Sequence, residues 1–287
     1  MEIQFKSICH LLLFSMVILL AKPVLAQSGN VPYGNNPDAG HYLKMADSTK
    51  IYYEVYGKGR PVVLLHGGLF GDISEYEKLI PKLSEHFKVI AIETRGHGKS
   101  EIGEQPFTYE LMVHDAYTVI RHETSDSTIV IGFSDGAVIA MKLTLLHPEI
   151  VRKMVFAGGN LALEGYRQGI KERLKNLTGK SMEQDYPDFV KDRKKIMPQP
   201  ERWDDFVEKL KNAWLNQTPI MPEQLKAIKC PVMVVGGDRD QYNGVDDFFN
   251  TYKFLPRASL AIIPNSDHIV FYRRPDLMED IIMAFIN

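Results

Sequence analysis

The chain has 287 residues, a formal net charge of −2 at pH 7 and 45% hydrophobic residues. This length suits one large α/β domain with a sizeable core, and the near-neutral charge gives no reason to expect nucleic acid or an anionic membrane surface as a partner. Of the two cysteines, only Cys230 lies beyond the N-terminal segment, so we expect core packing rather than disulfides to stabilise the fold.

The N-terminal segment, residues 1–26, is typical of a secretory signal peptide. Lys6 precedes an apolar run from Leu11 to Ala21, and Val24-Leu25-Ala26 has the pattern of a cleavage site. The run is shorter than the roughly 20 residues of a membrane-spanning helix, so we expect no stable membrane insertion, an uncleaved anchor being the alternative. The sequence therefore predicts an exported protein, periplasmic or secreted after cleavage near Ala26. It leaves the oligomeric state open.

Strand and helix patterns alternate after a flexible lead-in at residues 27–40. Apolar runs predict strands at residues 41–46, 51–56, 61–65, 89–92, 128–131, 154–157, 232–235 and 260–263, the first two forming a hairpin. Helical patterns occupy residues 75–87, 109–122, 137–146, 245–254 and 275–286. Continuous apolar runs indicate strands that are buried on both faces. Residues 41–287 are thus predicted to form one α/β domain with a mostly parallel, doubly wound sheet of about eight strands.

One interval breaks this alternation. Between Gly159 and Cys230 no strand pattern is convincing. Helical patterns at residues 165–177, 182–195 and 200–215 carry the aromatic residues Tyr166, Tyr186, Phe189, Trp203 and Trp214. An insertion between two strands, at about residues 161–228, must project from the carboxyl edge of the sheet as a lid. Most of its aromatic side chains should pack the lid helices together, and a minority should face a pocket.

The most informative motif is the Gly-x-Ser-x-Gly turn from Gly132 to Gly136. It follows an apolar strand and opens a helix, so its glycines permit a tight turn that exposes the hydroxyl of Ser134. The helix places its N-terminal amides beneath the site, where negative charge would develop. We expect Ser134 to be a nucleophile; the alternative is a serine in an ordinary loop.

A serine nucleophile needs a base and an acid that orients the base. Of the nine histidines, His268 follows the last strand, at the edge where ligands of such sheets gather; a capping or loop histidine is the alternative. Asp238 and Asp240 both follow the preceding strand. Asp240 lies farther into the loop and is predicted to orient His268, whereas Asp238 is expected to bind the turn. The order serine, aspartate, histidine suits a nucleophile elbow.

Two backbone amides are predicted to bind the oxyanion of a tetrahedral intermediate. One belongs to Asp135, and the other to Gly68 in the glycine-rich loop after the third strand, with Gly67 or Leu69 as alternatives. Asp135 and Leu69 are also candidate substrate contacts. The carboxylate of Asp135 could attract an amino-acid ester, or it could be an aspartate favoured by the helix dipole.

These residues resemble the α/β-hydrolase superfamily over nearly all of the predicted mature chain. Besides the His66-Gly67-Gly68 and Gly132–Gly136 motifs, residues 93–100 are similar to the family's Asp-x-Arg-Gly-x-Gly-x-Ser turn, with Glu93 in place of the aspartate. That position is structural in the family, so the replacement puts little in doubt. Gly-Phe-Ser-Asp-Gly and residues 152–156 look most like the biphenyl-hydrolase-like (valacyclovir-hydrolase-like) serine esterases.

The resulting hypothesis is a serine hydrolase that cleaves a small-molecule carboxylic ester through Ser134, His268 and Asp240. Amide, lactone or carbon–carbon bond hydrolysis and perhydrolase chemistry use the same parts and remain alternatives. Dehalogenase and epoxide hydrolase chemistry are disfavoured because the resembling families use an aspartate nucleophile. We expect neither a metal nor another cofactor, since no cluster has ligand-like spacing. A non-catalytic binding protein that keeps the fold is the rival from another class.

Overall fold

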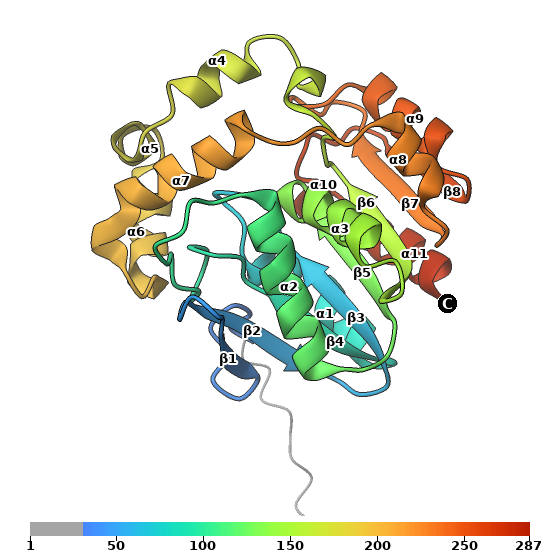
Figure 1. Cartoon of the computed structure of the whole chain (residues 1–287), viewed down its shortest axis with the longest axis horizontal. Coiled ribbons are helices and arrows are strands. Elements are labelled where there is room, and N and C mark those ends of the chain that lie inside the picture. The colour runs from blue at the N-terminus through green and yellow to red at the C-terminus, as the bar shows by residue number, and fades with distance from the viewer. Residues whose placement is uncertain (1–30) are drawn as a thin grey trace, which may run out of the picture. The chain divides into compact units, whose positions relative to one another are not determined.

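The computed structural model describes residues 31–287, which are built around one eight-stranded sheet (Figure 1). The strands are β1 (Gly40–Lys44), β2 (Lys50–Tyr56), β3 (Arg60–Leu65), β4 (Phe87–Ile92), β5 (Thr128–Phe133), β6 (Val151–Ala157), β7 (Val232–Gly237) and β8 (Ala258–Ile263). Their spatial order is β1-β2-β4-β3-β5-β6-β7-β8. β2 is antiparallel to β1 and β4, and all other neighbours are parallel. The predicted α/β architecture and mostly parallel sheet are confirmed.

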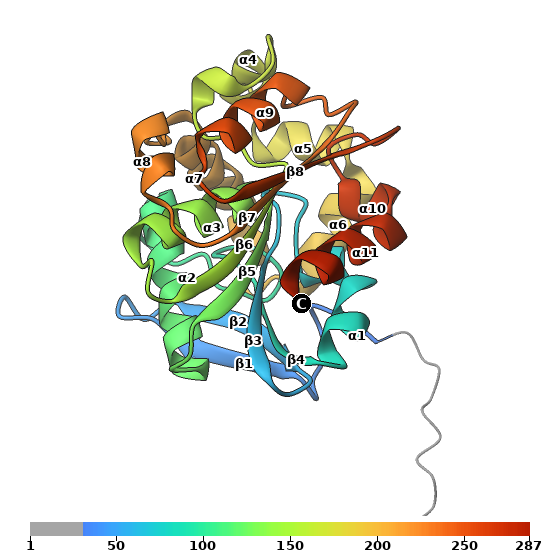
Figure 2. The ribbon, with the colours of Figure 1, turned by 90° about the vertical axis from the view of Figure 1, so that its right-hand side faces the viewer.

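Helices cover both faces of the sheet (Figure 2). Those that pack on it directly or through one another are α1 (Leu79–Ser84), α2 (Tyr109–Glu123), α3 (Asp135–Leu146), α9 (Val245–Phe254), α10 (Val270–Arg273) and α11 (Pro275–Ile286). Within β3, Val63 and Leu65 belong to the core on the α2–α3–α9 side, and Val62 and Leu64 to the core on the α1–α11 side. Because successive side chains of a strand alternate between faces, a strand buried twice must be apolar throughout.

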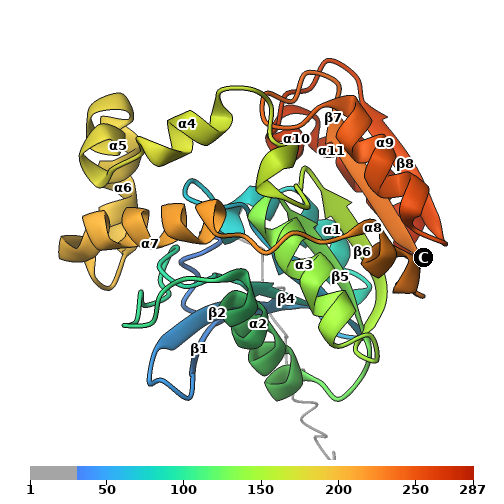
Figure 3. The ribbon, with the colours of Figure 1, turned by 45° about the horizontal axis from the view of Figure 1, so that its top comes forward.

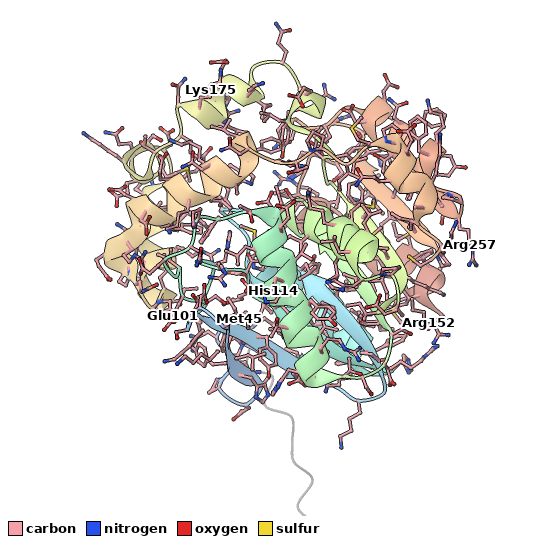
Figure 4. All side chains as sticks on the ribbon, in the orientation of Figure 1. Met45, Glu101, His114, Arg152, Lys175 and Arg257 are labelled. Atoms are coloured by element: carbon pink, nitrogen blue, oxygen red, sulfur yellow. The ribbon has the colours of Figure 1, made fainter. Side chains whose placement is uncertain are left out.

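The insertion between β6 and β7 is helical, as predicted. It holds α4 (Ile170–Lys175), α5 (Gly179–Asp185), α6 (Pro187–Ile196), α7 (Trp203–Leu215) and α8 (Pro222–Ala227), with 3₁₀ turns η2 (Leu163–Gly165) and η3 (Pro200–Arg202). Figure 3 shows α4 to α7 as an arch over one end of the sheet. Lys175 marks the outer side of this arch in Figure 4. The lid therefore projects from the carboxyl edge of the parallel strands.

Several predicted helix limits are wrong. The pattern at residues 182–195 is two helices, because Pro187 lacks an N–H and begins α6 rather than continuing α5. The pattern at residues 75–87 is also broken: it comprises the end of 3₁₀ turn η1 (Ile73–Tyr76), the helix α1 and the first residue of β4. Phe87 is taken by β4 because it pairs with Arg60 of β3. α8 and α10 were not predicted from the sequence.

The N-terminal part of the domain is bonded to the sheet. The carboxylate of Glu54, which is fully buried, accepts hydrogen bonds from the amides of Gly34 (3.0 Å) and Asn36 (2.8 Å). The expected flexible lead-in at residues 27–40 thus includes a segment fixed by β2. The predicted signal peptide, residues 1–26, lies outside the described residues. Within residues 31–287, no helix combines the length and apolar character needed to cross a bilayer.

Candidate functional site

Ser134 lies between β5 and α3 in a strained backbone conformation. Its φ of 51° and ψ of −115° are unusual for a residue with a side chain. A side chain at Gly132 would collide with the backbone of Gly136, and one at Gly136 would collide with the carbonyl oxygen of Leu65. Both glycines are therefore required for this turn, which aims the serine hydroxyl away from the sheet.

The loops after β7 and β8 bring an acid and a base to that hydroxyl. His268 Nε2 lies 2.9 Å from Ser134 Oγ, and His268 Nδ1 lies 2.8 Å from Asp240 Oδ2. A carboxylate only accepts hydrogen bonds, so Nδ1 donates to Asp240 and Nε2 accepts from the serine hydroxyl. The structure thus joins the three predicted residues in one hydrogen-bonded chain.

Asp240 is held in place by its own loop. Its Oδ1 accepts hydrogen bonds from the amides of Tyr242 (2.7 Å) and Asn243 (3.0 Å), and the residue is 1% exposed. Asp238 is instead exposed, and its Oδ1 accepts the amide of Ser266 (3.1 Å). Backbone hydrogen bonds at the turn lower the pKa of Asp238. The two aspartates lie where the sequence reasoning placed them.

Of the three candidate oxyanion donors in the loop after β3, two already donate their amide hydrogens to other groups. Gly67 N–H donates to Glu75 Oε2 (2.8 Å), Leu69 N–H donates to His97 Nε2 (2.9 Å), and Phe70 N–H donates to the Gly68 carbonyl (2.6 Å). Within residues 31–287, the amide of Gly68 donates no hydrogen bond. This favours Gly68 over Gly67 and Leu69 as an oxyanion donor.

The second predicted donor is the amide of Asp135, the first residue of α3. The first N–H groups of a helix have no partner within their own helix, and they carry the positive end of its dipole. Gly68 and Asp135 are close neighbours, because a side chain at Gly68 would collide with the carboxylate of Asp135. Gly68 thus lies beside the first residue of the helix that Ser134 caps, as two amides that serve one oxyanion require.

Substitution of Gly68 by alanine tests this loop. The added methyl group would collide with the carboxylate of Asp135 and lie 3.0 Å from the Trp214 ring, so the Gly68 backbone or the Asp135 side chain must shift. If the chain is the serine hydrolase that the sequence predicts, we expect kcat to fall about 10- to 100-fold, because a misplaced donor stabilises the oxyanion less. Steady-state kinetics would measure this effect, and an unchanged kcat would contradict the assignment.

His97 and Glu75, which are buried, accept hydrogen bonds from this loop on its core side. The sequence did not indicate that either residue belongs to the site. Burial and the neighbouring His66 lower the pKa of His97 well below its usual value, so its Nε2 remains free to accept the Leu69 amide. Burial raises the pKa of Glu75 to about 8, although the Gly67 amide and Arg193 act in the opposite direction. Glu75 is therefore protonated in the folded protein over the acidic and neutral range.

This pKa predicts a pH dependence of stability. The folded state keeps the proton of Glu75 up to a pKa of about 8, whereas an unfolded chain releases it near the usual glutamate pKa of 4.5. The free energy of unfolding should therefore decrease between these pH values. Glutamine at position 75 keeps an acceptor for Gly67 without a charge, so E75Q should lose this decrease. Denaturant titrations at about pH 5 and about pH 8.5 measure the free energy of unfolding of both proteins. The same decrease between these pH values in the wild type and in E75Q would contradict the prediction.

The remaining histidines do not compete with His268. His66 is buried, which lowers its pKa to about 4, and its Nε2 accepts the Thr94 amide (3.1 Å). His114 is an exposed residue of α2 (Figure 4). Among the histidines of residues 31–287, only His268 contacts the hydroxyl of Ser134.

The side chain of Asp135 links the site to the lid. Its two carboxylate oxygens accept hydrogen bonds from Tyr109 Oη (2.8 Å) and Trp214 Nε1 (2.7 Å). Burial raises the pKa of Asp135, while these two donors oppose that shift. Trp214 is thus one of the lid aromatics that face the site, whereas Trp203 donates to the Gly179 carbonyl within the lid. Leu69, the other candidate substrate contact, is 4% exposed and packs in the core.

Comparison with known proteins agrees with this fold. A family model described as alpha/beta hydrolase fold matches residues 61–177. The chain is 28% identical over 244 residues to a Haemophilus influenzae protein that is named, provisionally, as an esterase or lipase. These residues cover 79% of this chain and 83% of that protein.

Two further similarities extend over most of the chain. The 2-hydroxy-6-oxo-6-(2'-aminophenyl)hexa-2,4-dienoic acid hydrolase of Metapseudomonas resinovorans is 25% identical over 264 residues, covering 84% of this chain and 89% of that enzyme. The structure of an esterase from Exiguobacterium antarcticum matches with a TM-score of 0.70 at 23% identity, covering 86% of this chain and 98% of that chain. At this identity the structural match shows the fold alone.

Proposed function

The chain belongs to the α/β-hydrolase fold family, and from this premise we propose that it is a serine hydrolase that cleaves small carboxylic esters. The observation that carries the proposal is the continuous hydrogen-bonded chain Ser134–His268–Asp240 at the carboxyl edge of the sheet. The free amide of Gly68 beside this chain supports acyl transfer over mere binding.

In the proposed acylation step, Ser134 Oγ attacks the ester carbonyl carbon while His268 Nε2 takes the hydroxyl proton. The carbonyl electron pair moves to oxygen, where the amides of Gly68 and Asp135 stabilise the negative charge. Asp240 stabilises the imidazolium that forms. Collapse of the intermediate expels the alcohol, which receives the proton from His268 and leaves an acyl group on Ser134.

Water completes the turnover. His268, neutral again, takes a proton from water, and the resulting hydroxide equivalent attacks the acyl carbon. The second tetrahedral intermediate uses the same two amides. Its collapse releases the carboxylic acid and returns the proton from His268 to Ser134 Oγ.

A second candidate function, hydrolysis of a carbon–carbon bond, is favoured by the similarity to the Metapseudomonas resinovorans dienoic acid hydrolase. The same nucleophile, base and oxyanion donors would serve that reaction, as they would amide or lactone hydrolysis. Competing substrates separate these chemistries: an ester, an amide and a lactone with the same acyl group, and a 2-hydroxy-6-oxo-dienoate. The proposal expects the ester to give the highest kcat/KM. Preferred cleavage of the dienoate would instead support the second function, and no turnover of any substrate would favour a binding protein.

The carboxylate of Asp135 allows a finer proposal, that the substrate carries an amino group. Both of its oxygens already accept hydrogen bonds from neutral donors, so an ammonium group would have to share them. Aminoacyl and N-acylated aminoacyl esters test this selectivity. Equal kcat/KM for the two esters, unchanged in D135N, would contradict this selectivity. Asp135 would then serve only to bind Tyr109 and Trp214.

We also propose that the protein is exported, on the basis of the segment that ends at Ala26. Expression of the full chain in a bacterium followed by fractionation tests this. A mature N-terminus at Gln27 in the periplasm or medium is expected, and an intact cytoplasmic chain would contradict export.

A further inference from the structure

The lid holds the loop of the proposed oxyanion hole through one buried arginine. Arg193 of α6 donates from Nη2 to the Phe70 carbonyl (2.7 Å) and from Nη1 to Asp72 Oδ2 (2.6 Å). Its guanidinium also lies 5.2 Å from the ring centre of Phe189 on the same helix. Arg193 is 5% exposed, so this charge is removed from water and depends on these partners.

Both acceptors of Arg193 belong to the segment that carries Gly68. Asp72 uses its other oxygen, Oδ1, to accept the amide of Ser74 (2.7 Å) and so cap η1. The Phe70 carbonyl lies at the end of a three-residue turn that is closed by the Phe70 amide and the Gly68 carbonyl (2.6 Å). Arg193 therefore fixes the outer end of the turn against the first residues of η1.

This turn needs support because it is strained. Leu69, at its centre, has a φ of 57°, which a branched side chain rarely adopts. Residues in such conformations persist where their surroundings determine them from several sides. His97 holds the Leu69 amide from the core, and Arg193 holds the next carbonyl from the lid. Without Arg193, the turn would lose its hydrogen bonds to the lid and keep only packing contacts there, such as those of Phe70 with Tyr186 and Phe189.

We propose that Arg193 is a positioning residue, which couples the docking of the lid to the placement of the Gly68 amide that faces the oxyanion. The inference rests on the function proposed above. Arg193 should stabilise the tetrahedral intermediate, in which the Gly68 amide binds the oxyanion, more than it stabilises the bound ester. The loss of Arg193 should therefore lower kcat rather than raise KM.

The test compares R193M, R193K and D72N with K195M as the control. Lys195 lies on the same helix, but its side chain is 63% exposed and pairs with Asp192. Active sites are first counted by titration with a fluorophosphonate, which corrects for unfolded protein. Then kcat and KM are measured for one small ester, together with the inhibition constant of a trifluoromethyl ketone that forms a tetrahedral adduct with serine.

We expect kcat per titrated site to fall about 10- to 100-fold in R193M, with KM changed less than about twofold. The trifluoromethyl ketone should lose affinity in proportion to kcat. R193K should recover part of the loss because a lysine can reach one of the two acceptors, D72N should lose less than R193M, and K195M should match the wild type.

Unchanged kcat per titrated site in R193M would overturn the inference, as would a rise in KM alone. If R193M does not fold, R193K and D72N decide by the same criteria, since each weakens the contact without removing every donor. Failure of the proposed function looks different, because the wild type itself would then neither react with the fluorophosphonate nor hydrolyse the ester.

Discussion

Replacement of Ser134 by alanine is expected to lower kcat for ester hydrolysis by about 10⁶-fold. The variant keeps the oxyanion donors and the His268–Asp240 pair but has no oxygen that can attack the ester. Steady-state kinetics with a chromogenic ester measures the loss. Thermal unfolding should show a fold as stable as the wild type, since the methyl group of alanine occupies less space than the serine side chain.

The matched control is S125A, which removes the hydroxyl of an exposed serine in the turn before β5. It should retain the wild-type kcat. Retention of activity by S134A would show that the observed hydrolysis does not use this nucleophile, and the proposed mechanism would then be wrong.

Replacement of Asp240 by asparagine should lower kcat by about 10⁴-fold. Asp240 accepts the hydrogen of His268 Nδ1 and thereby leaves Nε2 free to take the serine proton. The amide group of asparagine can donate a hydrogen bond to Nδ1. This favours the histidine tautomer that carries its hydrogen on Nε2, and a protonated Nε2 cannot take the proton of Ser134. The imidazolium of the transition state also loses its negative partner.

D238N is the control for this prediction, because it changes the neighbouring aspartate, which is exposed and bound to the turn. It should change kcat less than about threefold. A large loss in D238N with little loss in D240N would reverse the assignment that the sequence pattern and the hydrogen bonds both support.

The core of the site could be predicted from the sequence because each of its residues lies in the connection that follows a strand of the sheet. Ser134, Asp240 and His268 come after β5, β7 and β8, whose carboxyl ends lie on one edge of the sheet. Parallel strands bring such positions together whatever the length of the connections between them. The glycines of the elbow also have a local cause, since a side chain at Gly132 or Gly136 would collide with neighbouring backbone.

The residues that hold the catalytic loops in place could not be predicted in this way. Arg193 lies 121 positions from Asp72, and which lid residue meets the loop depends on how the lid packs. Trp203 and Trp214 are both buried on α7, yet only Trp214 reaches Asp135. Glu75 fell inside a predicted helix, where a charged residue is ordinarily solvated, and only the fold shows it buried beneath Gly67.

The central claim is that Ser134 is an activated nucleophile. Intact-protein mass spectrometry after exposure to a fluorophosphonate, followed by peptide mapping, tests it directly. We predict one adduct per chain on the peptide that contains Ser134, no adduct in S134A, and slow labelling in H268A because the base is missing. An unlabelled, folded wild-type protein, or an adduct on another serine, would contradict the claim.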